Sequence, residues 1–213
     1  MPLRGNRLLA AVVLSLCALT CRAAPDYAGE PASPDARDAA GWIMDTNDHH
    51  GQPFAIVDKR EARVYVFDAA GHLIGASTAL LGMTPGDGSI PDIARRAPSS
   101  LLPDERTTPA GRFASQPGRN DKGEDIVWVD YRASLAIHRL RPAPAHERRP
   151  ARLASASPDD NRISFGCIVL PVGFYESVVA PTLGRHRGVV YVLPENSPAQ
   201  AMFGSIDVNL AAH

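Results

Sequence analysis

The hydrophobic and polar positions along this chain predict short β-strands joined by many turns. Residues Phe54–Asp58 and Arg63–Phe67 are rich in β-branched and aromatic side chains and alternate in part between apolar and polar positions. A turn at residues 69–71 leads into a third run that reaches Leu81, so the chain opens as a β-meander. Later strands are expected at residues 126–131, 135–138 and 188–193.

Two long segments lack any sustained periodicity and predict irregular loops. Residues 82–105 are dominated by Gly, Pro, Ser and Asp, and loops of this length in compact domains are often functional or mobile. Residues 172–183 instead carry apolar side chains at helical spacing and predict a helix that is interrupted near Pro181. The second loop, residues 139–160, is the basic part of the chain and holds Arg139, Arg141, Arg148, Arg149 and Arg152.

The ends of the chain predict further segments around one domain at residues 54–194. Residues 1–23 combine two early arginines, an apolar run and small residues near Ala23, which is typical of a cleaved signal peptide. The apolar run is too short to span a membrane, and nothing later is long enough. We expect residues 24–53 to be a loosely ordered lead-in with a short helix near residues 39–44, and residues 195–213 to be a tail.

Composition and charge narrow the class of protein. A chain with 45% hydrophobic and 21% charged residues suits one compact domain. Removing residues 1–23 takes away three basic and no acidic residues, so the mature chain has a net charge of about −4, which argues against nucleic-acid binding. No cluster has metal-ligand spacing and no Gly-rich phosphate loop follows a strand. We expect an exported periplasmic monomer without a membrane span, a metal or a cofactor.

Cys167 is the cysteine that the mature chain would keep, because Cys17 and Cys21 lie within residues 1–23. It follows a glycine between apolar residues of a short strand, which is how a nucleophile is often presented. A thiol needs a nearby base to become a nucleophile at neutral pH. His138 is the histidine that ends an apolar strand upstream of Cys167, so it is the candidate proton acceptor and donor.

Two interpretations of this cysteine and histidine remain open from the residues alone. In the first, His138 withdraws the thiol proton, Cys167 attacks a carbonyl, and the acyl group passes to an amine or to water. Backbone N–H groups of Phe165, Gly166 and Cys167 would then stabilise the oxyanion. In the second, Cys167 is an inert buried thiol and His138 a hydrogen-bonded residue at a strand end.

Residues 54–194 resemble the L,D-transpeptidase catalytic domain of the YkuD type. The segment Thr108-Pro109-Ala110-Gly111-Arg112-Phe113 is similar to the family's Thr-Pro-x-Gly-x-Phe turn, in which Gly111 takes a positive φ angle. His138 follows, and Ser164-Phe165-Gly166-Cys167 is similar to the Ser-His-Gly-Cys signature. The resemblance implies a β-sandwich-like or barrel-like fold, with one helix after the nucleophile strand and two long loops.

The function that this resemblance implies is acyl transfer between peptidoglycan stem peptides, with Cys167 as nucleophile and His138 as proton acceptor. Cross-linking or remodelling of the cell wall would be the result. Two alternatives stay open: a hydrolase that cuts the same bonds, and a catalytically silent wall-binding domain. The second is motivated by Phe165 in place of the signature histidine and by Val169, where the family commonly has Asn or Arg.

The arginines are the candidates for binding stem-peptide carboxylates, because guanidinium groups bind carboxylates in a bidentate manner. His138 and Ser164 are 26 positions apart, longer than is usual in the family, so residues 139–160 are interpreted as an inserted lid. A solvated charged loop is the alternative. Arg112 and Arg162 lie beside the motifs and could instead pair with Asp130 or Asp160. The candidate substrate-binding residues are Arg112, Arg148, Arg149, Arg162 and Ser164.

Overall fold

The structure is a computed structural model that describes residues 25–203. The predicted signal peptide at residues 1–23, with Cys17 and Cys21, lies outside the described residues, as do residues 204–213. Within the described range, Cys167 is a free cysteine. No helix in this range is both long and apolar enough to cross a membrane.

A large β-sheet forms the framework of residues 25–203. Eight strands lie in the order β3-β2-β1-β10-β5-β6-β7-β9, and two short strands, β4 and β8, pair separately. β1 runs parallel to β10 and β7 runs parallel to β9, whereas the remaining pairs of the large sheet are antiparallel. The strands are β1 (Phe54–Asp58), β2 (Arg63–Phe67), β3 (Leu73–Thr78), β4 (Leu81–Gly82), β5 (Gly111–Arg119), β6 (Asp125–Asp130), β7 (Leu135–Arg139), β8 (Arg162–Ser164), β9 (Ile168–Leu170) and β10 (Gly188–Val192).

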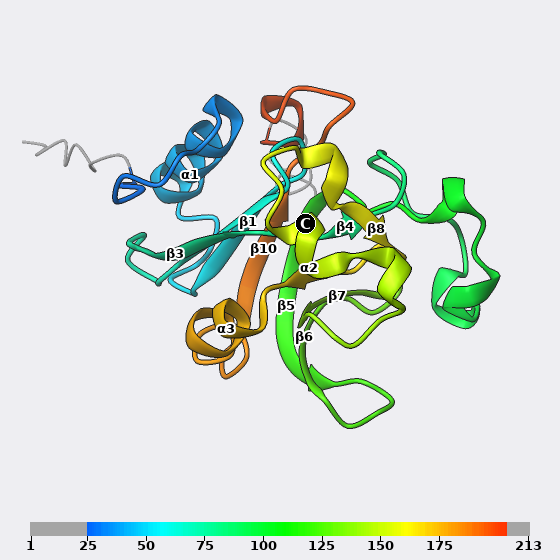
Figure 1. Ribbon diagram of the computed structural model, residues 1–213. Coiled ribbons are helices and arrows are strands. Elements are labelled where there is room, and N and C mark those ends of the chain that lie inside the picture. Colours follow the sequence, from blue (N-terminus) through cyan, green and yellow to red (C-terminus); the bar gives the residue numbers. More distant parts are fainter. Residues whose placement is uncertain (1–24, 204–213) are drawn as a thin grey trace, which may run out of the picture.

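The expected mainly β class is confirmed, and its first two strands have the predicted bounds. The third predicted run is two strands, β3 and β4, because the chain leaves the sheet edge between Thr78 and Leu81. The sequence also predicted the irregular segment at residues 82–105, which holds three short 3-10 turns. In Figure 1 this green segment projects from one side of the molecule, opposite helix α1 (Pro34–Thr46).

Alternation along the strands builds two separate cores. Ala55 and Val57 of β1 face a core that also contains Val127 of β6 and Ile168 of β9, so strands from both ends of the sheet order meet in one cluster. The sheet therefore folds over this core. The intervening residues of β1 face outward into a second core. A strand that is buried on both faces is apolar at most positions, which explains the hydrophobic runs in the sequence.

The short helix expected near residues 39–44 lies within a longer one, because residues 34–46 form the thirteen-residue helix α1. Ser33 caps it by accepting a hydrogen bond from the N–H of Ala36 at 3.0 Å, and Pro34 takes the first helical position. Asn47 ends it in the left-handed conformation. The helix buries a face of small and aliphatic residues against the outer side of β1, β2 and β10, namely Ala36, Ala39, Ala40, Ile43 and Met44.

Within the expected tail at residues 195–213, the described residues 195–203 pack against the fold, and the rest lies outside the described residues. Phe203 is buried, and its ring stacks on Trp42 of α1 with 4.7 Å between the ring centroids. Figure 1 shows this red segment beside α1. The sequence did not predict this contact, because Trp42 and Phe203 lie more than 150 residues apart in the chain.

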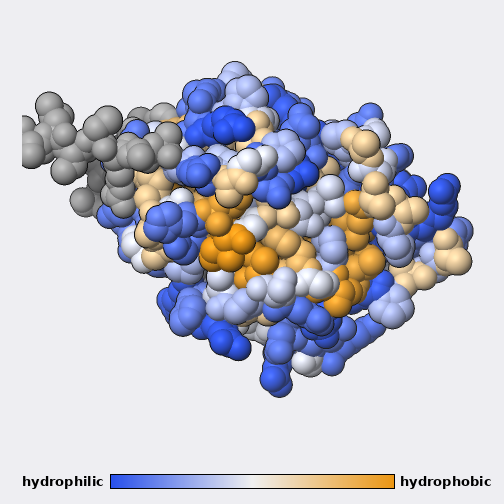
Figure 2. All heavy atoms as spheres, turned by 60° about the vertical axis from the view of Figure 1, so that its left-hand side comes forward, coloured by the Kyte–Doolittle hydropathy of each residue, from blue (hydrophilic) through white to orange (hydrophobic). Residues whose placement is uncertain are grey.

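The predicted helix at residues 172–183 is shorter and less regular than expected. One α-helical turn, α3 (Val172–Phe174), continues into a five-residue π-helix at Tyr175–Val179. The chain then turns at Pro181, which lacks an N–H group to continue the helix. Figure 2 faces the side of the molecule where α1 and α3 lie and shows apolar side chains exposed among polar ones. The edge strand β3 contributes one such residue, since Ile74 is 41% exposed.

Candidate active site

The turn between β8 and β9 carries Cys167 and requires glycine before it. Gly166 has a φ of 131°, and a side chain on it would lie 2.7 Å from the carbonyl oxygen of Thr107. Only glycine fits both the backbone conformation and this close approach. The sequence Gly-Cys is thus explained by packing against the segment that contains Thr107 and Thr108.

Hydroxyl groups hold this turn from both sides. Thr108 Oγ1 donates to the carbonyl oxygen of Gly166 at 2.8 Å and accepts from the N–H of Gly82 at 2.8 Å. Ser164 Oγ donates to the carbonyl oxygen of Cys167 at 2.7 Å and accepts from the N–H of Gly166 at 3.1 Å. Both side chains are buried, so these bonds fix the backbone on which the thiol stands.

Two groups with predicted roles take part in these bonds. The N–H of Gly166 donates to Ser164, and the hydroxyl of Ser164 donates within the turn. Oxyanion binding by Gly166 and substrate binding by Ser164 stay predictions. The N–H of Phe165 stays a predicted oxyanion donor.

His138 lies on β7, directly beside β9. Its Cα pairs with that of Val169, and Ile137 pairs with Ile168. Alternation along the strands places residue 138 and residue 167 on the same side of the sheet. His138 on β7 and Cys167, directly before β9, therefore line one cavity.

Hydrogen bonding sets the tautomer of His138. Its Nδ1 lies 2.8 Å from the carbonyl oxygen of Arg139, which can only accept. The proton of the neutral ring is therefore on Nδ1, which leaves Nε2 as an acceptor. Burial lowers the pKa of His138 to about 4, and the positive charges of Arg141 and Arg149 act in the same direction. At neutral pH the ring is thus unprotonated and able to take a proton.

The thiol of Cys167 is half-buried, and its Sγ lies 3.5 Å from the carbonyl oxygen of Ser134. Burial raises the pKa of this thiol above its usual value. A hydrogen bond from the backbone of Ala136 and the charge of Arg141 oppose the rise. The cavity therefore holds a neutral thiol and a neutral imidazole.

Cys167 and His138 line one cavity of about 370 Å³. Most of its wall is apolar, and Trp128 and the irregular segment at residues 82–105 both contribute to it. The indole of Trp128 packs against Gly118 of β5, where a Cβ would lie 2.4 Å from it. The other lining residues are Ile93, Arg96, Pro98, Leu101, Asn120, Ile126, Ala133, Ser134, Ala136, Arg141, Pro142, Ala143, Pro144, Arg149, Ser164 and Phe165.

Of the arginines predicted to bind substrate, one lines this cavity and three lie elsewhere. Arg149 lines the cavity, from the short helix α2 (Arg149–Leu153) in the inserted loop. Arg148 is exposed and lies outside it, at two neighbouring hollows of the same loop. The interpretation of residues 139–160 as a segment that lies against the site is consistent with this placement of Arg149.

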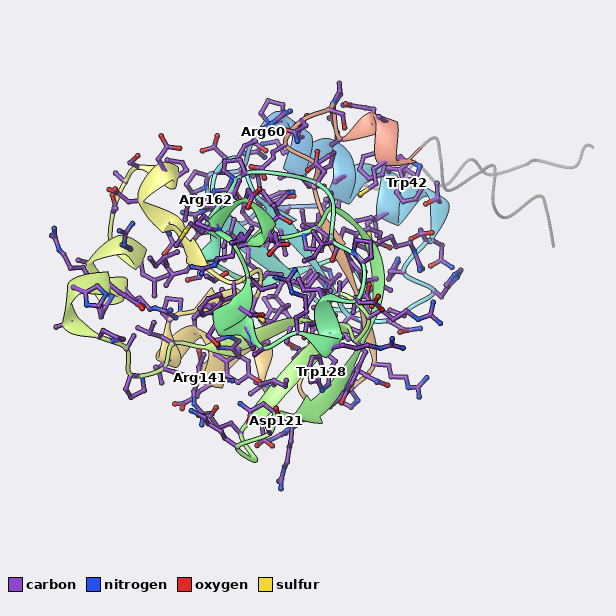
Figure 3. All side chains as sticks on the ribbon, turned by 90° about the vertical axis from the view of Figure 1, so that its right-hand side faces the viewer. Trp42, Arg60, Asp121, Trp128, Arg141 and Arg162 are labelled. Carbon is purple, nitrogen blue, oxygen red and sulfur yellow. The ribbon has the colours of Figure 1, made fainter. Side chains whose placement is uncertain are left out.

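Arg112 and Arg162 do not line the cavity, and neither has the predicted partner. Arg112 binds Asp48, with 2.5 Å between Nε and Oδ2. Arg162 binds Glu195, with 2.5 Å between Nη2 and Oε2, and its Nη2 also donates to the carbonyl oxygen of Lys59. In Figure 3, Arg162 lies toward Arg60, away from Trp128 and Arg141. Both arginines therefore connect distant parts of the chain. Their positions beside the motifs did not predict this role.

Phe165 and Val169, the two residues that differ from the L,D-transpeptidase pattern, have different surroundings. The ring of Phe165 is 39% exposed, lines the cavity, and lies under the guanidinium of Arg106 at 4.7 Å. Val169 is buried with Leu80 and Leu153, so it anchors the inserted loop rather than lining the cavity. The valine is explained by this packing.

Five polar or aromatic residues of the cavity were not predicted as site residues from the sequence: Arg96, Asn120, Trp128, Ser134 and Arg141. Asn120 lies in the β5–β6 hairpin and Arg96 in the irregular segment at residues 82–105, and neither belongs to a motif. The basic run at residues 139–152 was the one available signal, since it includes Arg141.

Comparisons with known proteins found no match among family models and none among curated proteins. Solved structures of L,D-transpeptidases are similar in fold at low identity. LdtMt1 in complex with imipenem aligns at 17% identity and TM-score 0.37, over 66% of this chain and 58% of its own. The E. faecium catalytic domain aligns at 16% and 0.38, over 67% and 98%. The cell shape determining protein Pgp2 from Campylobacter jejuni aligns at 14% and 0.43, over 74% and 55%.

This chain thus spans less than two thirds of the first of these structures. All the identities are below 20% and all the TM-scores below 0.5.

Proposed function

We propose that this protein is an exported cysteine acyltransferase that acts on peptidoglycan stem peptides in the periplasm. The observation that carries the proposal is the shared cavity of Cys167 and His138, in which the ring of His138 keeps Nε2 free to accept a proton. The resemblance of residues 54–194 to L,D-transpeptidase domains supplies the substrate class. The apolar wall and the arginines suit a peptide with an aliphatic body and a carboxylate.

The reaction proceeds in two half-reactions. In the first, Nε2 of His138 takes the proton of Cys167 Sγ while the sulfur attacks the carbonyl carbon of the donor peptide bond. His138 then gives this proton to the amine that leaves, and a thioester remains on Cys167. In the second, an acceptor amine attacks the thioester, its proton passes to His138, and the sulfur leaves and regains a proton. Arg149 is the candidate that binds a carboxylate of the stem peptide.

Incubation with a tetrapeptide stem and an amine acceptor tests the proposal. Mass spectrometry should find the joined product with the wild-type protein and none with Cys167→Ala. His138→Gln should form it at least about 100-fold more slowly, because general acid–base catalysis contributes a factor of this order. A wild-type reaction mixture without any joined or exchanged product contradicts acyl transfer, and a mixture that contains only the shortened stem indicates a hydrolase.

A second candidate function is a wall-binding domain without catalysis. The raised pKa of the Cys167 thiol favours it, because a protonated thiol is a poor nucleophile. Sedimentation with purified sacculi separates the two candidates. Retention on sacculi with an unchanged muropeptide profile supports wall binding, whereas a changed profile supports the enzyme.

A further inference from the structure

Three arginines supply the positive charge of the Cys167 cavity, and no acidic side chain lines it in the described part of the chain. Two of them pair with acids of their own loops. Arg96 binds Glu105 through both Nη atoms at 2.7 and 2.9 Å, and Arg149 binds Glu147. The third, Arg141, binds a residue of a different element.

Arg141 forms an ion pair with the β5–β6 hairpin. Its Nε lies 2.8 Å from Oε2 of Glu124, and each side chain is 30% exposed. Glu124 is itself held by Asn120, whose Nδ2 donates to Oε2 at 2.6 Å and whose Oδ1 accepts from the N–H of Glu124 at 3.0 Å. The position of the Arg141 guanidinium is therefore set by the hairpin as well as by the inserted loop.

Arg141 also shares the cavity with both predicted reacting residues. It follows the end of β7 by two residues, three after His138, and lines the cavity with His138 and Cys167. Its charge opposes the rise in the pKa of the Cys167 thiol and contributes to the low pKa of His138. Val169, on the strand after Cys167, is packed against Leu153 of the inserted loop and brings no charge.

We propose that Arg141, held by Glu124, is a positioning residue whose charge stabilises the Cys167 thiolate as its proton passes to His138. The inference rests on the acyl transfer proposed above and adds to it the source of the positive charge. The proton moves from Sγ to Nε2 while the electron pair stays on sulfur, so negative charge appears inside the cavity. The same guanidinium disfavours the imidazolium, so His138 readily passes the proton on to the leaving amine.

The pH dependence of Cys167 alkylation by iodoacetamide tests this inference. Arg141→Met should raise the thiol pKa by about 0.5 to 1 unit, because a partly exposed and paired charge has a smaller effect than an adjacent buried one. At pH 7 the alkylation rate should fall about 3- to 10-fold. Arg141→Lys, which keeps the charge, should stay near the wild type. Arg119→Met is the matched control, because Arg119 is 73% exposed, lies in the same hairpin and does not line the cavity.

The direction of the shift separates an electrostatic role from a structural one. Burial raises the thiol pKa, so a variant that merely loosens the site and admits water should lower it. A thiol pKa that stays constant or falls in Arg141→Met overturns the inference. Histidine NMR gives a second measurement, since loss of the positive charge should also raise the pKa of His138. The other charged groups around the two residues are Arg96, Arg139, Arg149, Glu105, Glu124 and Glu147.

Alkylation needs no peptide substrate, so this test stands apart from the test of acyl transfer. A protein that forms no joined product but shows the upward shift in Arg141→Met retains the electrostatic assignment and loses the proposed function. A protein that joins stems but shows no shift loses only the assignment of Arg141.

Discussion

At the scale of single residues, Thr108 supports the turn that carries the candidate nucleophile Cys167. Its one hydroxyl joins Gly82 at the end of β4 to Gly166, the residue before Cys167. Its carbonyl oxygen accepts from Nζ of Lys59 at 2.9 Å. Three segments that are distant in the sequence therefore meet at this threonine.

Replacing Thr108 with Val should loosen the turn of Cys167. The valine has the same shape but leaves the buried N–H of Gly82 without its acceptor, so we expect a loss of about 1 to 3 kcal/mol in the free energy of unfolding. Urea denaturation measures this. Thr108→Ser keeps the hydroxyl and should lose less than about half as much. Equal losses in the two variants would show that the methyl group, rather than the hydrogen bonds, matters.

The buried imidazole of His138 predicts a pH dependence of stability. Its pKa is about 4 in the folded protein and about 6.5 in an unfolded chain, so only the unfolded state takes up a proton between these values. The contribution of His138 to the free energy of unfolding is therefore fully present above pH 6.5. It is lost as the pH falls toward 4, and the loss is at most about 3 kcal/mol. Urea denaturation of the wild type and His138→Gln at several pH values measures it. A difference between the two proteins that does not change with pH contradicts this expectation.

At the scale of elements, the inserted segment at residues 139–160 depends on one apolar contact. Leu153 of α2 packs on Leu80 and Val169, and Oγ1 of Thr78 donates to its carbonyl oxygen at 2.7 Å. This small cluster lies beside β9 and so fixes the segment next to the cavity. Both Arg141 and Arg149 are carried on the segment that it holds.

Leu153→Ala should weaken the attachment of this segment. We expect a loss of about 2 to 3 kcal/mol in the free energy of unfolding, at the lower end for a leucine because the cluster is small and near the surface. Proteolysis within residues 140–150 should become faster. Leu102→Ala is the matched control, because Leu102 is 59% exposed and should change neither quantity. Unchanged proteolysis in Leu153→Ala would indicate that other contacts hold the segment.

At the scale of the whole molecule, a buried ionic network ties the C-terminal segment to the site. Lys59 is fully buried, and its Nζ lies 2.7 Å from Oδ1 of Asp87 and 3.3 Å from Oε1 of Glu195. Glu195 also binds Arg162, at the start of the strand that precedes Cys167. The residues after the sheet are thus connected to the segment that carries the nucleophile.

Lys59→Met should be strongly destabilising. It removes the cation from two partly or fully buried carboxylates, and breaking one partner of a buried ion pair typically costs about 3 to 5 kcal/mol. The midpoint of urea denaturation measures the loss, and Lys122→Met in the exposed hairpin is the control. A loss below about 1 kcal/mol would show that water replaces the ammonium group at little cost.

Much of the sheet could be predicted from the sequence, because strands buried on both faces need mostly apolar runs, as in residues 54–57 of β1. His138 could be assigned to a strand end and Cys167 to the segment beside a short strand, but their common cavity depends on the pairing of β7 with β9, which the sequence does not specify. The roles of Arg112 and Arg162 could not, because their partners Asp48 and Glu195 are brought near only by folding. Helix α1 was underestimated because its buried face is mostly alanine, which gives a weak hydrophobic pattern.

The central claim is that Cys167 is a nucleophile that His138 activates, and acylation by a carbapenem tests it most directly. After incubation with imipenem, mass spectrometry of the intact protein should find one adduct, and peptide mapping should place it on Cys167. His138→Gln should form the adduct more slowly, and Cys167→Ala should form none. A wild-type protein that remains unmodified, or an adduct that persists in Cys167→Ala, would contradict the account.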